Sequence, residues 1–451
     1  MAWVGIDGFL RGLRAYFRAH AFDNSEFSDL LGALEKASGR ELDSWAAEWL
    51  QTSGVNTLAP EFELAEDGSY RSFAVRQTAH PDFPTLRRHR IGIGLYDLVD
   101  GRVVRRTSLE TDVRGELTEV PALAGERQPD LLLLNEGDLT YAKIRLDERS
   151  LATAVRHLGD LDDSLARALV WGAAWDMTRD AEMASSDFVE LVLTGIGTET
   201  DQTAVTALPR YARTAVSYYS APEHRDALAA RWETGLRELL EAAEPGSDHQ
   251  LQFARAYAAA ARSDEALAHV AGLLDGGVVH DGLTVDTDLR WLLLTALARE
   301  GRADEARIAE ELERDHTISG RQSAAAARAA RPTAEAKAEA WEAAVEREDT
   351  PNETQRSIAL AFGVAGQREL LAPYLERYLT TADTIWERLG TQRATVALEH
   401  LFPMPLVSPE TVARVDEWLE TSSANPAAKR YVREGRADMV RALAAQERDA
   451  G

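Results

Sequence analysis

The sequence of 451 residues contains no cysteine, which excludes disulfide bonds and thiolate metal ligands. No apolar run approaches the ~20 residues that a membrane-spanning helix needs, and no signal peptide opens the chain. Basic residues are few, since 50 lysines and arginines face 75 aspartates and glutamates, for a formal net charge of −25. Nucleic acid and anionic membranes bind basic surfaces, so neither is expected as a partner.

These absences fit a soluble chain in a reducing cytoplasm. The simplest explanation of the acidity is solubility. The alternative is attraction of cationic ligands, such as the amino termini of peptides.

The motifs that announce a catalytic centre are also missing. There is no His-Glu-x-x-His, and neither Glu223-His224 nor Glu399-His400 completes the reversed His-x-x-Glu-His. No nucleophile elbow or phosphate-binding loop occurs. His80 and His89 could share a loop region, but exposed or hydrogen-bonded histidines are the simpler expectation. We therefore expect no catalytic residue and no metal ligand in this chain.

What is present divides the chain into three regions, as its length suggests. Residues 1–57 have apolar residues at helical spacing, as in Phe9, Leu13 and Phe17. This pattern predicts three short helices, with a cap at Asn24-Ser25 and the second helix ending at Gly39.

Residues 58–148 favour strands. Asp100-Gly101 is a strong hairpin signal, and about seven short β-prone segments predict a small antiparallel β-sandwich. Near its end, Leu131–Leu134 and the alternating residues Ala142–Leu146 read as two strands around a turn at Asn135–Asp138.

Residues 149–451 read as helices to the end, with glycine or proline at many expected turns, including Pro209 and Gly276-Gly277. Helix pairs of similar size recur. The pattern predicts a large superhelical array of antiparallel helices, akin to HEAT or armadillo repeats, with a concave inner face. The fold class is thus multidomain and mainly α.

Few residues in the helical region suggest chemistry. Trp171 and Trp175 share a helical face, where burial is more probable on general grounds than a ligand platform. Asp286 or Asp288 is expected to cap the helix that carries Arg290. Arg290 either forms an ion pair or points into the concavity, where its guanidinium could hold a carboxylate. Arg314, Arg328 and Arg331 are most simply a solvated helix face.

The stretch Asn135–Leu146, with Asp138-Leu-Thr-Tyr-Ala-Lys-Ile-Arg-Leu, resembles the last strands of the β-sandwich in bacterial M1-family zinc aminopeptidases of the aminopeptidase N type. Upstream, Phe9–Phe22, Gly39 and the pair Trp45 and Trp49 resemble the helices that close that family's thermolysin-like domain. Downstream, Leu169–Trp171, Trp175-Asp176 and Arg179-Asp180 match its opening helices of the large helical domain. The resemblance covers the whole chain and is actinobacterial in style.

This resemblance implies a zinc-dependent peptidase that removes amino-terminal residues from peptides. The family's zinc ligands and catalytic residues lie upstream of the point that matches Ala2, so none transfers to this chain. We therefore expect a chain that begins inside a longer protein, is inactive alone, and has the missing N-terminal catalytic portion and peptide substrates as partners. Its helical domain would enclose the substrate chamber, and the resemblance implies that Arg290 holds a peptide's terminal carboxylate.

Two alternatives stay open at this stage. One is a non-enzymatic helical-repeat scaffold that binds other proteins. Such a scaffold should open with a polar capping helix, whereas Phe9, Leu13 and Phe17 form an apolar stripe that expects a partner surface. The other is a naturally short homologue that works alone or with a separate catalytic chain.

Overall fold

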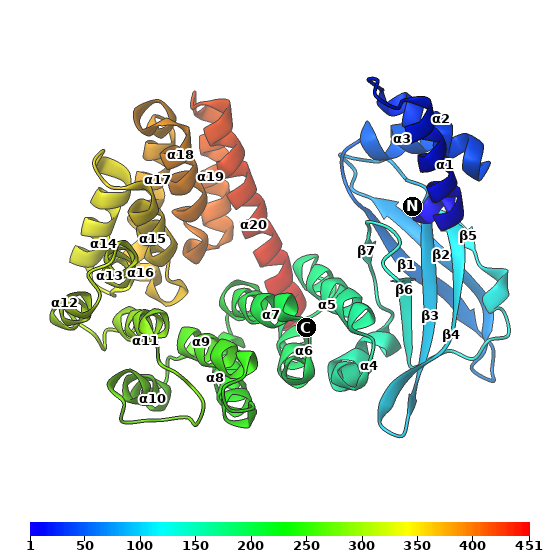
Figure 1. Ribbon diagram of the computed structural model, residues 1–451. Helices are drawn as coiled ribbons and strands as arrows, with labels where there is room; N and C mark the ends of the chain where they lie inside the picture. Colours follow the sequence, from blue (N-terminus) through cyan, green and yellow to red (C-terminus); the bar gives the residue numbers. More distant parts are fainter. The chain divides into compact units, whose positions relative to one another are not determined.

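The computed structural model describes all residues from Met1 to Gly451. The chain forms two compact units (Figure 1). The first comprises Met1–Met177 with Thr198–Asp201, and the second comprises Thr178–Gly197 with Gln202–Gly451. The division at residues 57 and 148 stays a prediction, because the compact units are defined at a coarser level.

The first unit opens with short helices: η1 (Ala2–Val4), α1 (Ile6–Ala19), α2 (Phe27–Ser38) and α3 (Asp43–Leu50). Gly39 ends α2 in the left-handed conformation with φ 71°, as expected. The start of α2 lies past the expected Asn24-Ser25 cap, because Glu26 and Asp29 form a reciprocal capping box there.

The apolar stripe of α1 is only partly covered. Trp3, Leu34 and Leu42 form a buried cluster, against which Phe9 packs. Phe17 is 65% exposed, so the outer part of this stripe has no cover in the chain.

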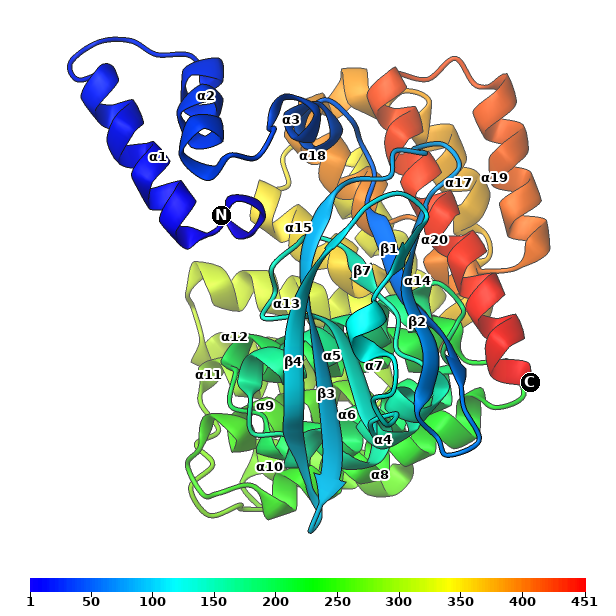
Figure 2. The same cartoon turned by 90° about the vertical axis from the view of Figure 1, so that its right-hand side faces the viewer.

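Seven strands form two sheets, with orders β5-β2-β1-β7 and β4-β3-β6. Both sheets supply fully buried residues, such as Leu58 and Val75 from one and Ile91, Ile93 and Leu133 from the other. The long hairpin of β3 and β4 stands out in Figure 2. The elements are β1 (Asn56–Leu64), β2 (Tyr70–Ala79), β3 (His89–Val99), β4 (Arg102–Val113), β5 (Leu117–Glu119), η2 (Pro121–Leu123), β6 (Leu131–Glu136) and β7 (Lys143–Ile144).

The β3–β4 turn is the one that the sequence predicted. Asp100 and Gly101 both have positive φ, at 50° and 78°, as a two-residue type I′ turn requires. Register is kept from Val99↔Arg102 to His89↔Val113, with one bulge near Tyr96.

The two strands expected at the end of the β-region are present as β6 and β7. β6 and β7 do not pair with each other: β6 joins β3, whereas β7 lies parallel to β1 in the other sheet. The sandwich is therefore not purely antiparallel. The Asn135 side chain stabilises the turn between β6 and β7, because its Nδ2 donates to the carbonyl oxygen of Thr140 and its Oδ1 accepts from the amides of Leu139 and Thr140.

The rest of the chain is helical. The first unit ends with α4 (Glu148–His157), η3 (Leu158–Asp160) and most of α5 (Ser164–Arg179). The second unit contains α6 (Ser185–Gly195), η4 (Ile196–Thr198, whose last residue belongs to the first unit), α7 (Gln202–Thr214), η5 (Ala215–Tyr219), α8 (Arg225–Ala242), α9 (Asp248–Ala260), α10 (Asp264–Asp275), α11 (Thr287–Arg299), α12 (Glu305–Arg314), α13 (Ile318–Ala330), α14 (Ala334–Trp341), η6 (Glu342–Glu346), α15 (Asn352–Phe362), η7 (Ala365–Gln367), α16 (Arg368–Leu371), α17 (Tyr374–Ala382), α18 (Ile385–His400), η8 (Met404–Leu406), α19 (Pro409–Thr421) and α20 (Pro426–Ala450).

These helices stack in a continuous inner layer. α7, α9, α11, α13, α15, α18 and α20 each contact the next in that order, while helices such as α10, α12 and α19 flank them. The last helix, α20, also contacts α6 and η5, so the stack returns to its own beginning (Figure 1). One expected turn is wrong: Pro209 lies inside α7, although proline usually breaks a helix interior.

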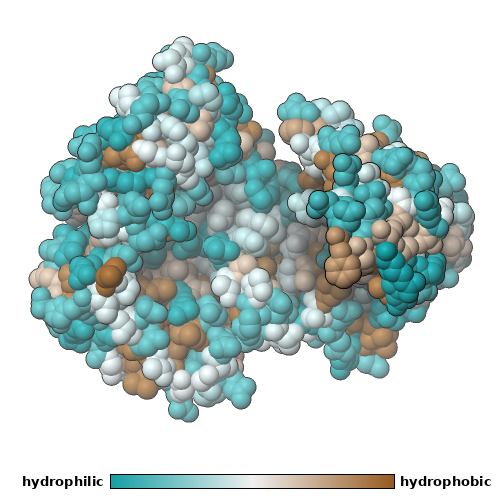
Figure 3. All heavy atoms as spheres, turned by 45° about the horizontal axis from the view of Figure 1, so that its top comes forward, coloured by the Kyte–Doolittle hydropathy of each residue, from teal (hydrophilic) through white to brown (hydrophobic).

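None of the helices is both long and apolar enough to cross a bilayer. The surface visible in Figure 3 is mostly hydrophilic, with apolar residues scattered among polar ones.

Candidate functional site

The helical unit contains a cavity of about 630 Å³ bounded by η5 and by the inner-layer helices α7, α9, α11, α13 and α15, together with α8. An adjoining recess of about 170 Å³ shares Arg213 and Trp232 with it. Because six or more helices contribute to these walls, only the assembled stack creates the site.

The walls are strongly basic. The cavity carries Arg213, Arg262 and Arg299, and the recess adds Arg210 and Arg255. The only acidic residue on either wall is Glu300. The chain as a whole has 75 acidic and 50 basic residues, so a wall with five arginines and one glutamate reverses the overall balance.

Only Arg299 is neutralised within this group. Its guanidinium bonds to Glu300 at 2.8 Å and to the carbonyl oxygens of Ala259 and Ala261, each at 2.8 Å. The other four arginines have no carboxylate at ion-pair distance: Arg210, Arg213, Arg255 and Arg262. Most arginines elsewhere in the chain have such a partner, for example Arg307 with Asp275 and Arg414 with Glu376.

The local field at the cavity is therefore positive. Desolvation by the surrounding helices lowers the pKa of Arg213, and the positive charges of Arg299 and Arg210 lower it further. The Arg213 side chain is nevertheless open to solvent in the cavity. The pKa of Arg225 is also lowered, first by burial of its side chain and then by the positive charges of Arg368 and Arg262. Burial raises the pKa of Tyr218 on the same wall, against the pull of Arg213, Arg262 and Arg225. The Tyr218 hydroxyl stays protonated and is available as a hydrogen-bond donor.

Arg290, the residue singled out from the sequence, lies elsewhere. Asp286 caps α11, accepting from the amide of Leu289 at 2.9 Å, which settles the choice between Asp286 and Asp288. Arg290 in that helix's first turn forms two bonds of 2.6 Å to Glu311 and one of 2.9 Å to the carbonyl oxygen of Leu274.

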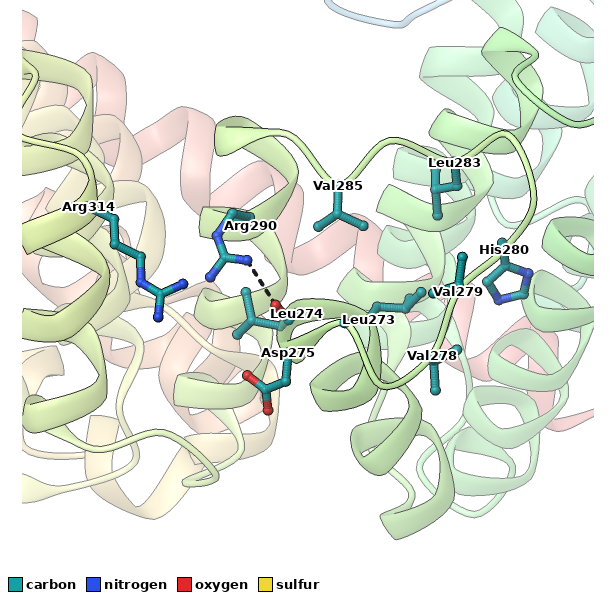
Figure 4. Close-up of a pocket in the computed structure, with 11 residues that line it drawn as sticks. Leu273, Leu274, Asp275, Val278, Val279, His280, Leu283, Val285, Arg290 and Arg314 are labelled. Carbon is teal, nitrogen blue, oxygen red and sulfur yellow. Dashed lines mark hydrogen bonds between the residues drawn. The ribbon is translucent and has the colours of Figure 1, made fainter.

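Figure 4 shows Arg290 beside Arg314 at the edge of a cavity of about 330 Å³ under the loop that follows α10. Glu311, which is 5% exposed, holds the Arg290 guanidinium in an interhelical ion pair. Arg314 pairs with Glu310 and Arg328 with Glu305, both on exposed helix faces as expected.

The two histidines considered from the sequence are separate in space and in role. His80 is exposed beside Asp82. His89 is buried, with Nε2 3.0 Å from Gln77 and Nδ1 2.7 Å from Thr140. Burial and the nearby Arg87 lower the pKa of His89 to about 4, so it is neutral and structural.

Trp171 is also structural. It is 4% exposed, and its indole nitrogen donates to Glu199 at 2.8 Å. Arg167 binds the same carboxylate with two bonds of 2.9 and 3.0 Å. Burial would raise the pKa of Glu199, but the bonds from Arg167 and Trp171 outweigh it and lower the pKa to about 2.

Histidine, aspartate and glutamate side chains nowhere gather in threes with a geometry that could hold a metal ion. Zinc in proteins takes three or four such ligands, so the residues of this chain do not fit a zinc centre. His269 and His280, whose Nε2 atoms lie 3.1 Å apart, form a pair with no third ligand.

Comparison with known proteins agrees with the fold. Residues 131–441 match the model of the ERAP1-like C-terminal domain. Aminopeptidase N of Streptomyces lividans is 49% identical over 457 residues, covering 100% of this chain and 53% of that protein. Aminopeptidase N of Lactococcus lactis subsp. lactis is 37% identical over 59 residues, which cover 13% of this chain and 7% of that protein.

A mainly helical stack preceded by a β-sandwich, together with these matches, defines the class: the chain belongs to the M1 aminopeptidase family that carries the ERAP1-like C-terminal domain. In particular, it matches the C-terminal half of Streptomyces aminopeptidase N. The chain spans about half the length of that relative. Family members generally depend on zinc.

The family assignment was readable from the sequence, but the basic cavity was not. Arg213 and Arg262 are far apart in the chain, and each sits among residues of ordinary helix composition. No local signal marks them, because only the contacts among α7, α9 and α11 bring their walls together. The sole usable hint was that Arg213 has no acidic residue three or four positions away, and it does not extend to Arg262, which has Glu265 three positions on.

Proposed function

We propose that this chain is the substrate-enclosing part of a cytoplasmic zinc aminopeptidase that removes amino-terminal residues from peptides. The zinc and the catalytic groups would come from an N-terminal portion that this chain does not contain. The residues here would shape the chamber and bind the part of the peptide distant from the reacting bond. Binding energy from such remote contacts orients the substrate and raises the rate.

The observation that carries the proposal is the cavity lined with arginines. It lies in a chain that is 49% identical to an aminopeptidase N, with the match covering 100% of this chain. A peptide whose amino terminus lies in the catalytic portion extends its carboxyl end toward other domains. Guanidinium groups without a carboxylate partner are suited to that end, because they bind carboxylates with two parallel hydrogen bonds. Arg213 and Arg262 meet this condition.

Arg290 is a further candidate for the same role. Its guanidinium borders a cavity, but a peptide carboxylate would have to replace Glu311, which already makes two bonds of 2.6 Å. Arg213 needs no such exchange. We therefore expect Arg213→Gln to weaken peptide binding more than Arg290→Gln does.

The test joins this chain to the N-terminal half of the Streptomyces relative and compares the chimaera with the chain alone. The chimaera should hydrolyse aminoacyl amides and peptides and retain one zinc ion, measured by metal analysis. The isolated chain should do neither. Turnover by the purified chain, abolished by a chelator, would overturn the division of labour.

The matched controls are two substrates of the chimaera. An aminoacyl amide has no carboxylate for Arg213 to bind, so Arg213→Gln should leave its kcat/KM unchanged. For a peptide of about ten residues, the same substitution should raise KM by about tenfold, the value of one charge-assisted hydrogen bond. Equal effects on both substrates would assign Arg213 to structure.

A further inference from the structure

The cavity and its recess hold more positive charge than the single carboxylate at a peptide's carboxyl terminus can neutralise. Five arginines face it and its recess, and Glu300 compensates only Arg299. Four positive charges remain. A single carboxylate has two oxygens, which saturate with one or two guanidinium groups.

Such a cluster is unfavourable without a ligand. Arginine does not lose its proton in proteins, so Arg213 and its neighbours cannot relieve their repulsion by titration. Burial lowers the pKa of Arg213, and the neighbouring Arg299 and Arg210 lower it further, which reflects the same repulsion. A ligand that brings several negative charges into the cavity would remove this cost.

The walls also limit what the ligand can be. The cavity has apolar surface from Trp232, Leu360 and several alanines between the arginines, which suits the methylene groups of side chains. The net charge of −25 repels long polyanions such as nucleic acid from the exterior. A short chain with spaced carboxylates fits both conditions.

We infer that the cavity selects peptides with acidic residues, aspartate or glutamate, in the segment beyond their amino-terminal residues. This specificity rests on the proposed peptide-binding function and narrows its substrate class. The hydroxyl of Tyr218 and the guanidinium groups of Arg213 and Arg262 form one anion subsite. Arg210 and Arg255 in the recess form the next.

Binding to the full chain of 451 residues tests this directly. Three labelled decapeptides share their amino-terminal half and differ in the other, which carries four glutamates, four glutamines or four lysines. By fluorescence anisotropy at low ionic strength, the glutamate peptide should bind at least about tenfold more tightly than the glutamine peptide. Amidating its carboxyl terminus should cost only part of this difference.

Arginine variants locate the effect. Arg255→Gln should lower the affinity for the glutamate peptide about tenfold and leave the glutamine peptide nearly unchanged, whereas Arg213→Gln should weaken both peptides, because both carry the terminal carboxylate. Arg433→Gln, an exposed arginine of α20 outside both walls, is the matched control and should change neither. Helical circular dichroism and melting temperature confirm that each variant is folded.

The outcomes separate this inference from the function on which it rests. Equal binding of the glutamate and glutamine peptides would overturn acidic selection and leave peptide enclosure standing. Loss of all preference on amidation would mean that one terminal carboxylate is the only anion bound, which also overturns it. If none of the peptides binds, even in the chimaera, the proposed function itself fails. If inorganic phosphate binds as tightly as the glutamate peptide, the cavity is a site for simple anions, and the inference about acidic peptides is overturned.

Discussion

The closure of the helical stack depends on one buried carboxylate near the chain's end. Asp449 on α20 accepts a bond of 3.1 Å from the amide of Ser186 and one of 2.9 Å from the amide of Ala221. Its side chain is fully buried. Ser186 lies in the first turn of α6, whose own N-cap residue, Ala184, provides no side-chain cap. Asp449 therefore caps α6 from the far end of the sequence.

Replacing Asp449 with alanine removes the only acceptor for both amides. An N-cap is worth about 1 kcal/mol, and each buried donor left without a partner costs about 1–3 kcal/mol. We expect Asp449→Ala to lower the free energy of unfolding of the helical unit by about 2–4 kcal/mol. Asp449→Asn keeps one acceptor oxygen in place and should cost about half as much.

Urea unfolding and hydrogen exchange measure the two parts of this prediction. The amides of Ser186 and Ala221 should exchange faster in Asp449→Ala, because opening of the junction between α20 and α6 becomes easier. The control is Asp438→Ala on the same helix, since that side chain is 55% exposed and pairs with Arg441 at the surface. It should cost less than about 0.5 kcal/mol. Equal effects of the two substitutions would refute the capping role.

Two further predictions concern pH. The folded-state pKa of His89, lowered to about 4, lies below its unfolded value of about 6.5. Its contribution, at most about 3 kcal/mol, is complete above pH 6.5 and lost as the pH falls from about 6.5 to about 4, so a variant His89→Gln should have a flatter pH profile in denaturant titrations. For Glu199 the folded pKa of about 2 is also depressed, so its stabilisation is present above about pH 4.5 and lost between about 4.5 and 2. Glu199→Gln should lower the unfolding midpoint at pH 7, because Arg167 is then left buried without a charge partner, and an unchanged midpoint would contradict this.

Local signals in the sequence predicted local structure well. Asp100-Gly101 forms its hairpin turn because both residues tolerate positive φ, and Gly39 ends α2 for the same reason. Asp286 caps α11 because its side chain reaches an amide three residues on. Each of these depends on residues within one turn of the chain.

Errors arose where distant residues decide the structure. The sequence predicted a small antiparallel sandwich, yet its last strand, β7, lies parallel to Thr57 and Leu58 of β1. The alternation of apolar and polar residues identifies a strand and its solvent-exposed face, but it does not show which strand of which sheet it will pair with. Pro209 was read as a turn because proline removes one helix bond locally, and the packing of α7 against α6 and α9 holds the helix through it.

The net charge of the chain does not predict the charge of the cavity, because contacts between residues distant in sequence decide which side chains line it. A total of −25 argues for cationic ligands if charge is spread evenly, but folding sorts the charges. Many carboxylates pair with arginines on helix faces away from the cavity, as Glu305 does with Arg328, whereas four of the five arginines on the cavity and recess walls have no such partner. Arg213 and Arg262 belong to that remainder. The sign of the cavity is thus set by which helix faces meet in the closed stack, and substitutions that reverse one wall charge should alter ligand preference without a change in the sign of the total.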